Sequence, residues 1–207
     1  MGEIKEGPRA ISGPLGTSSE LDRHADDELE RTLPSNMPQP GAIIADKYRI
    51  ERSIARGGMG AVYAATHLVS RKRVALKWML PTIGSVSGAR ERFIREACAT
   101  ARIDHPNIVD IYDVGNDGSS VFLVMEFLHG ETLAERFARE DIPAHEAIAL
   151  LMPAMRAVAA AHAHGVIHRD LKPDNIFLCR TQEGDQLEPK VLDFGISKIA
   201  NDESNNH

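Results

Sequence analysis

The sequence predicts an α+β fold of two lobes, because two kinds of apolar pattern follow one another along the chain. Alternating, β-rich runs come first and predict a mostly antiparallel, five-stranded lobe that includes one helix. Longer stretches with helical periodicity follow and predict a mostly helical second lobe. The five expected strands lie near 48–54, 61–66, 74–79, 108–114 and 121–127.

The helices are predicted by side-chain spacing and by the residues that end them. Residues 88–103 repeat apolar side chains such as Phe93 and Ala97 at helical spacing. Pro106 ends this helix, because proline cannot continue it. The other expected elements are helices at 132–139 and 144–164 and short strands near 176–178 and 190–192.

The balance of hydrophobic and charged residues is typical of soluble proteins. The 207 residues are 43% hydrophobic and 26% charged, with a formal net charge of −6. Basic patches typical of nucleic-acid binding are not found, so no nucleic-acid partner is expected. The longest apolar stretch, around 157–163, is interrupted by histidine and predicts no membrane segment. Cys98 and Cys179 are expected to be reduced thiols, and the cytoplasm is the expected location.

The first part of the chain differs from the rest. Residues 1–45 are rich in Gly, Pro, Ser and acidic residues, with few large apolar ones, so we expect a disordered tail. We expect the ordered domain to span 46–207. Its first lobe would cover 46–126, a hinge 126–131, and an incomplete second lobe 132–207.

A glycine-rich run between the first two strands indicates a phosphate-binding turn. Gly57, Gly58 and Gly60 allow the backbone to approach phosphate oxygens and to point N–H groups at them. Val62 and Tyr63 follow directly and favour a strand, whereas a dinucleotide-binding turn requires a helix there. A hairpin that covers phosphates fits better, and from these residues alone a plain glycine hairpin is the alternative.

The segment from Asp170 to Asp193 carries the most informative chemistry. Asp170, Lys172 and Asn175 are closely spaced, and Asp193 follows on the next apolar segment. Phosphoryl transfer from ATP with Mg²⁺ needs an oriented acceptor hydroxyl, screened phosphate charge and hard oxygen ligands for the metal. These residues predict that reaction, with Asp170 and Lys172 as catalytic residues and Asn175 and Asp193 as Mg²⁺ ligands.

The chain resembles the eukaryotic-like serine/threonine protein kinases of bacteria. The residues that carry the resemblance are 168–175 (His-Arg-Asp-Leu-Lys-Pro-Asp-Asn), 193–195 (Asp-Phe-Gly) and 57–63 (Gly-Gly-Met-Gly-Ala-Val-Tyr). The resemblance covers about 46–207 and implies the two-lobed protein-kinase fold. It also implies transfer of the γ-phosphate of ATP to serine or threonine hydroxyls of a protein substrate. Ala55 departs from the family pattern, which usually has glycine there.

The resemblance further implies an ATP site between the lobes. Lys77 would contact the α- and β-phosphates and form an ion pair with Glu96, which taken alone looks like a solvated surface acid. Residues 126–128 look like a hinge whose backbone binds the adenine edge. The full set of implied ATP-binding residues is Ile54, Gly57, Gly58, Gly60, Val62, Ala75, Lys77, Glu96, Met125, Glu126, Leu128 and Phe177.

Histidines near these motifs are expected to be structural. His168 is expected in an apolar stack with Phe194, Ile111 and Thr100. His162 and His164 lie two apart on a helix and point to different faces, which predicts surface histidines, not a metal site.

Two functions stay open from the sequence. In the family, the chain continues beyond Gly195 through an Ala-Pro-Glu motif and several helices, which are not found in this sequence. The underside of the 144–164 helix would then lose its cover, which predicts a marginally stable or aggregation-prone second lobe. The first function is an ATP-dependent serine/threonine protein kinase, which Lys172-Pro173 favours over a tyrosine kinase. The second is a nucleotide-binding module that transfers no phosphate.

Overall fold

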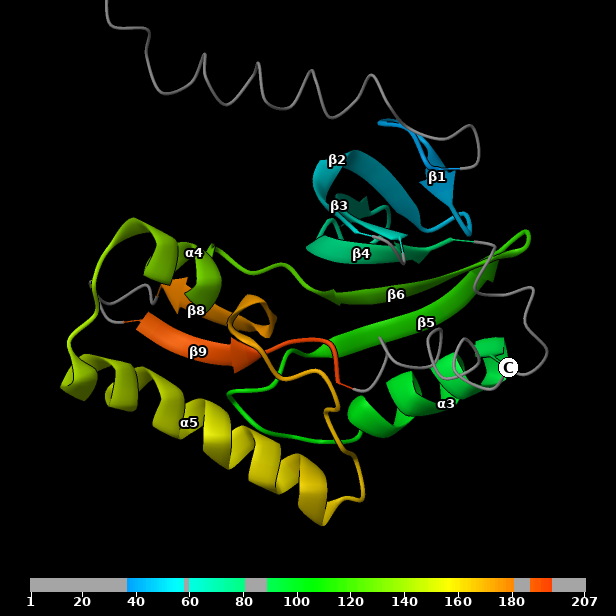
Figure 1. Cartoon of the computed structure of the whole chain (residues 1–207). Coiled ribbons are helices and arrows are strands. Elements are labelled where there is room, and N and C mark those ends of the chain that lie inside the picture. Colours follow the sequence, from blue (N-terminus) through cyan, green and yellow to red (C-terminus); the bar gives the residue numbers. More distant parts are fainter. Residues whose placement is uncertain (1–36, 58–59, 81–88, 181–186, 195–207) are drawn as a thin grey trace, which may run out of the picture. The chain divides into compact units, whose positions relative to one another are not determined.

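The computed structural model of the chain describes residues 37–57, 60–80, 89–180 and 187–194. Most of the expected tail, residues 1–36, lies outside the described residues, as do Gly58 and Gly195. The described residues form one antiparallel sheet with a helix, followed by a smaller sheet with two helices (Figure 1).

The first sheet has six strands in the order β1-β2-β3-β4-β6-β5, and each neighbouring pair is antiparallel. The strands are β1 (Ile43–Ile44), β2 (Tyr48–Gly57), β3 (Gly60–His67), β4 (Arg73–Met79), β5 (Ile111–Asp117) and β6 (Ser120–Glu126). The central strands β3, β4 and β6 are buried almost throughout, because both of their edges are paired and their side chains are rich in Val, Ala, Leu and aromatic residues.

The sheet differs from the expectation at both edges. The additional strand β1 pairs with β2 through Ile43 and Ile44, so ordered structure begins before the expected boundary at residue 46. Ile44 is 4% exposed, and its burial explains why this short segment joins the sheet. Strand β5 begins at Ile111, not at 108, because Ile108 instead forms a parallel bridge to Val191 in the other sheet.

Helix α3 (Ala89–Thr100) packs beside β5 (Figure 1). Its buried residues Phe93 and Ala97 form a cluster with Met79, Val121 and Leu123. The helix ends at Thr100, three residues earlier than expected, and the chain turns there. The Thr100 hydroxyl donates to the carbonyl of Glu96 at 3.0 Å, which satisfies this buried polar group within its own helix.

The second part begins after the hinge. Strand β7 (Gly130–Thr132), which was not expected, pairs with β8 (Ile176–Arg180), and β8 pairs with β9 (Leu187–Val191). Helices α4 (Leu133–Arg139) and α5 (Ala144–Ala163) begin close to the expected positions. A 3₁₀ turn, η1 (Pro173–Asn175), leads into β8.

Helix α5 lies along β9 and supplies much of the second core (Figure 1). Its inner face buries five residues: Leu150, Ala154, Ala157, Val158 and Ala161. Another face exposes Ile148, Met152 and Met155. By length and composition α5 is also apolar enough to cross a membrane, contrary to the expectation that no stretch is. This is a weak indication, because a core helix that buries one face has the same composition.

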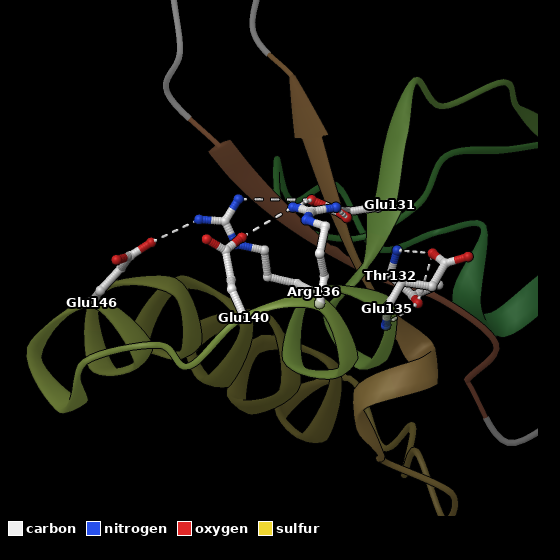
Figure 2. Close-up of polar contacts among 7 residues, drawn as sticks. Glu131, Thr132, Glu135, Arg136, Glu140 and Glu146 are labelled. Atoms are coloured by element: carbon white, nitrogen blue, oxygen red, sulfur yellow. Dashed lines mark hydrogen bonds and ion pairs between the residues drawn. The ribbon is translucent and has the colours of Figure 1, made fainter. Parts of the chain in front are cut away.

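One arginine joins three elements of the second part (Figure 2). The guanidinium of Arg136 in α4 lies 3.8 Å from Glu131 in β7, 2.7 Å from Glu140 and 3.2 Å from Glu146 in α5. Arg139 also bonds to Glu131, and mainly through this bond it lowers the pKa of the Glu131 carboxyl. The network therefore fixes the start of α5 against α4 and β7.

The preceding turn is fixed by a capping box at the start of α4 (Figure 2). The Thr132 hydroxyl accepts from the backbone N–H of Glu135, and the Glu135 carboxylate accepts from the backbone N–H of Thr132. These two bonds satisfy donors that the first turn of a helix leaves unpaired.

Replacing Arg136 by methionine should lower the free energy of unfolding by about 2 kcal/mol, because it leaves three carboxylates without a shared cation. Arg139→Met is the matched control, since Arg139 is 53% exposed and Arg136 only 20%. Urea unfolding of both variants checks the prediction. Equal losses would show that burial of Arg136 is not what gives the network its strength.

Candidate active site

The glycine-rich hairpin joins β2 and β3. Gly57 pairs with Gly60 across the turn, and Gly60 pairs with Met79 of β4. Gly60 has φ of +155°, and a Cβ atom there would lie 1.9 Å from the carbonyl oxygen of Trp78. Gly57 has open space around it. Only Gly60 of these two is therefore required to be glycine by the fold itself.

The expected ion pair between Lys77 and Glu96 is not formed. Lys77 Nζ instead lies 2.7 Å from Asp193 Oδ1. Glu96 lies 3.2 Å from Arg169, which the sequence analysis had given no role. Asp193 and Arg169, the two residues that form these pairs, both have positive φ, +54° and +61°, a backbone conformation that is uncommon for residues other than glycine.

Asp170, Lys172 and Asn175 are brought together as expected. Lys172 Nζ lies 3.3 Å from Asp170 Oδ2. The amide nitrogen of Asn175 donates to the backbone carbonyl of Asp170 at 2.7 Å and to its carboxylate at 3.2 Å. The loop thus holds a carboxylate between an ammonium group and an amide, close to solvent.

The donor set at Asn175 and Asp193 fits a magnesium ion. Because the amide nitrogen of Asn175 is bonded to Asp170, its amide oxygen is left as the group that can bind a cation. The backbone N–H of Leu192 donates to the carbonyl of Asn175 at 2.9 Å, which brings the next residue, Asp193, beside it. An amide oxygen and a carboxylate are the hard ligands that Mg²⁺ prefers.

His168 and Phe194 form the expected ring contact, with centroids 4.8 Å apart. His168 Nε2 bonds to the carbonyl of Leu192 at 2.8 Å, and burial lowers the pKa of the imidazole. Ile111 does not join this stack as expected, because Phe194 belongs to the core beneath β8 and β9 whereas Ile111 packs on the α3 cluster. The sequence shows apolar residues but not which core each one joins.

An apolar cluster lies next to Lys77, since it includes Val62, the residue paired with Lys77, and Ala75 of the same strand. Ala75 and Met125 are buried in it, and Val62 and Leu128 pack against them. It also contains two residues that the sequence analysis missed, Val109 and Leu192. Leu192 directly precedes Asp193, and this position in the sequence could have identified it as a residue of the site.

Two other expected ATP-binding residues lie outside this cluster. Ile54 on β2 is 40% exposed, and Phe177 on β8 pairs with Thr132 of β7 and lies beside Gly130. The hinge residue Glu126 is engaged by the fold. Its backbone N–H donates to the carbonyl of Asp110, and its carboxylate lies 2.5 Å from Lys190 Nζ.

We expect Gly60→Ala to destabilise the chain by about 2 kcal/mol or more, because alanine is strained at this φ and meets the Trp78 carbonyl. Gly57→Ala should change the free energy of unfolding by less than about 0.5 kcal/mol. Thermal and urea unfolding of the pair measure both values. Equal changes in the free energy of unfolding for the two variants would contradict the positive φ and the close Trp78 carbonyl at Gly60.

Lowering the pH should weaken the fold through His168. Its folded pKa lies below the ordinary value near 6.5, so its contribution is intact above that pH and is lost as the pH falls further, when the unfolded chain takes up the proton. Unfolding between pH 7.5 and 5.5 should therefore show a steeper loss for the native chain than for His168→Gln. Parallel curves would indicate that His168 is protonated equally in both states.

Comparison with known proteins agrees with this arrangement. The protein kinase domain model matches residues 48–207. The chain is 37% identical over 164 residues to the serine/threonine-protein kinase pkn2 of Myxococcus xanthus, covering 79% of this chain and 20% of that protein. It is 40% identical over 171 residues to a probable serine/threonine-protein kinase, PknB, of Lactococcus lactis, covering 81% and 26%.

A solved structure shows the same fold. The kinase domain of Mycobacterium tuberculosis PknI superposes with a TM-score of 0.69 at 29% identity, covering 77% of this chain and 64% of that one. The chain thus spans about a quarter or less of the two curated relatives and under two thirds of the solved domain. With its antiparallel first sheet, its paired catalytic-loop residues and this match, the chain belongs to the bacterial serine/threonine protein kinase family.

Proposed function

We propose that this chain binds ATP with Mg²⁺ and transfers the γ-phosphate to serine or threonine hydroxyls of proteins. The observation that carries the proposal is the joining of Asp170, Lys172 and Asn175 in one loop, with Asp193 placed beside Asn175 by a backbone hydrogen bond. Phosphoryl transfer depends on placement and electrostatics more than on covalent chemistry, and this loop supplies placement.

Each residue has a role that follows from its contacts. The Asp170 carboxylate orients the substrate hydroxyl and accepts its proton, and Asn175 holds that carboxylate in place. Lys172, 3.3 Å from Asp170, screens the transferred phosphate. Asn175 and Asp193 are the proposed ligands of Mg²⁺, which neutralises phosphate charge when bound.

The nucleotide base and phosphates are assigned to the hairpin and the cluster beneath it. In this proposal the backbone of Gly57 and Gly60 lies over the phosphates, and Lys77 contacts them. The cluster around Ala75 provides an apolar wall for adenine.

One observation favours nucleotide binding without transfer as the second candidate. Lys77 and Asp193 form an ion pair at 2.7 Å, so part of the charge that phosphate and metal would meet is already compensated. Glu96, which would otherwise hold Lys77, lies against Arg169. These two pairs differ from the expected Lys77–Glu96 pair, and that difference supports the second candidate.

The test is phosphoryl transfer from labelled Mg-ATP by the purified 207-residue chain, to itself and to a generic basic protein. Asp170→Asn should lower the rate by at least a hundredfold, since a positioned base contributes about 10²–10⁴. Asp174→Asn is the matched control, because Asp174 is exposed in the same loop and should leave the rate within twofold.

Binding of a fluorescent ATP analogue to the same variants separates the two candidates. Label incorporated by the native chain and lost only in Asp170→Asn supports the kinase. Saturable analogue binding with no label in any variant supports the nucleotide-binding module and contradicts the kinase.

A further inference from the structure

A second hollow lies apart from the candidate active site. It has a volume of about 830 Å³ and is formed by the loop before β5, by β7, α4 and α5, and by the ends of β8 and β9. None of Lys77, Asp170, Lys172, Asn175 and Asp193 lines it. Its size is within the range of ligand-binding pockets, and its function is not explained by ATP binding.

One wall of the hollow is rigid and already neutralised. Arg136 lines it and is held by Glu131, Glu140 and Glu146 (Figure 2). Because each side of this guanidinium faces a carboxylate, Arg136 is committed to the fold. Arg136 therefore shapes this wall, but its positive charge is already compensated and is not available to a ligand.

Two other arginines in the hollow are available. Arg156 of α5 and Arg180 at the end of β8 both line it and are exposed, and neither makes an ion pair within 4 Å in the part of the chain that the structure describes. The charge of Arg180 also contributes to lowering the pKa of Glu131. A guanidinium binds a carboxylate through two parallel N–H groups. The hollow can thus accept carboxylates at two separate elements.

The floor between the charged groups is apolar. Leu150 is 8% exposed, and Pro153, Leu187 and Pro189 line the hollow beside it. Charged rim and apolar floor together match a chain in which acidic and apolar side chains are interspersed.

A backbone acceptor adds a third feature. Pro153 lies inside α5 and has no N–H, so the carbonyl of Ala149, four residues earlier, lacks its helical donor. Ala149 and Pro153 both line the hollow. The backbone N–H of an extended peptide could supply the missing donor.

The lining offers no continuous positive surface to a polyanion. Arg136, Arg156 and Arg180 are matched in the lining by Glu131, Glu146 and Glu188, so nucleic acid would meet as many negative groups as positive ones. A peptide with spaced acidic residues can contact the two available arginines and avoid Glu188.

We propose that this hollow is a docking site for an extended protein segment in which acidic and apolar residues are interspersed. The site would recruit a protein partner independently of phosphoryl transfer; that this partner is also a substrate rests on the proposed kinase function.

The test is fluorescence anisotropy of the full chain with a labelled ten-residue peptide of alternating glutamate and leucine. The native chain should bind it at least tenfold more tightly than a peptide of alternating lysine and leucine. The double variant Arg156→Glu/Arg180→Glu should bind the acidic peptide at least tenfold more weakly than the native chain, and Arg156→Gln/Arg180→Gln should fall between.

The matched control is Arg49→Glu/Arg102→Glu, which changes the net charge equally at two exposed arginines outside the hollow. It should keep the affinity within twofold, and Asp170→Asn should bind the peptide as the native chain does. If phosphoryl transfer is not observed but the acidic peptide still binds, only the proposed kinase function is contradicted, and the docking site is not.

Three results would overturn the docking site. They are no binding of the acidic peptide by the native chain, equal weakening in the control pair, and binding of labelled oligo-dT that the double variant abolishes. The melting temperature of each variant shows that it is folded.

Discussion

The backbone of Val191 and Leu192 holds the candidate site together. Val191 donates to and accepts from the loop at 107–109, Leu192 donates to Asn175, and the carbonyl of Leu192 bonds to His168. Three segments distant in sequence meet on these two residues. Each of these hydrogen bonds contributes only about 1 kcal/mol net to the free energy of unfolding. Breaking one leaves a buried polar group unpaired, which costs more than the bond itself contributed, so we expect the bonds to form or break together.

Local chemistry could be predicted from the sequence. Asp170, Lys172 and Asn175 lie in one short loop, so their spacing alone brings them together, and the structure confirms this. The expected strands and helices were also largely found, because β-rich and helical patterns depend on nearby residues. Gly60 could be singled out only as part of a glycine run, since the carbonyl that excludes a side chain there comes from a neighbouring strand.

Long-range pairing could not be predicted in the same way. Lys77 has two acidic residues that could pair with it, Glu96 and Asp193, and no sequence pattern says which one is nearer. The pairing that forms, with Asp193, joins residues 116 positions apart, and both Asp193 and Arg169 have backbone conformations that few residue types occupy. Strand β1 was missed for a related reason: a two-residue strand is too short to show alternation, and only burial against β2 reveals it.

The parallel bridge between Ile108 and Val191 has a mechanical consequence. The two sheets are connected covalently through 127–129 and again by hydrogen bonds at this bridge. The ion pairs Lys77–Asp193, Glu96–Arg169 and Glu126–Lys190 link the same two parts of the chain. Any displacement of the glycine hairpin relative to Asp170 therefore has to strain or open these contacts together with the bridge.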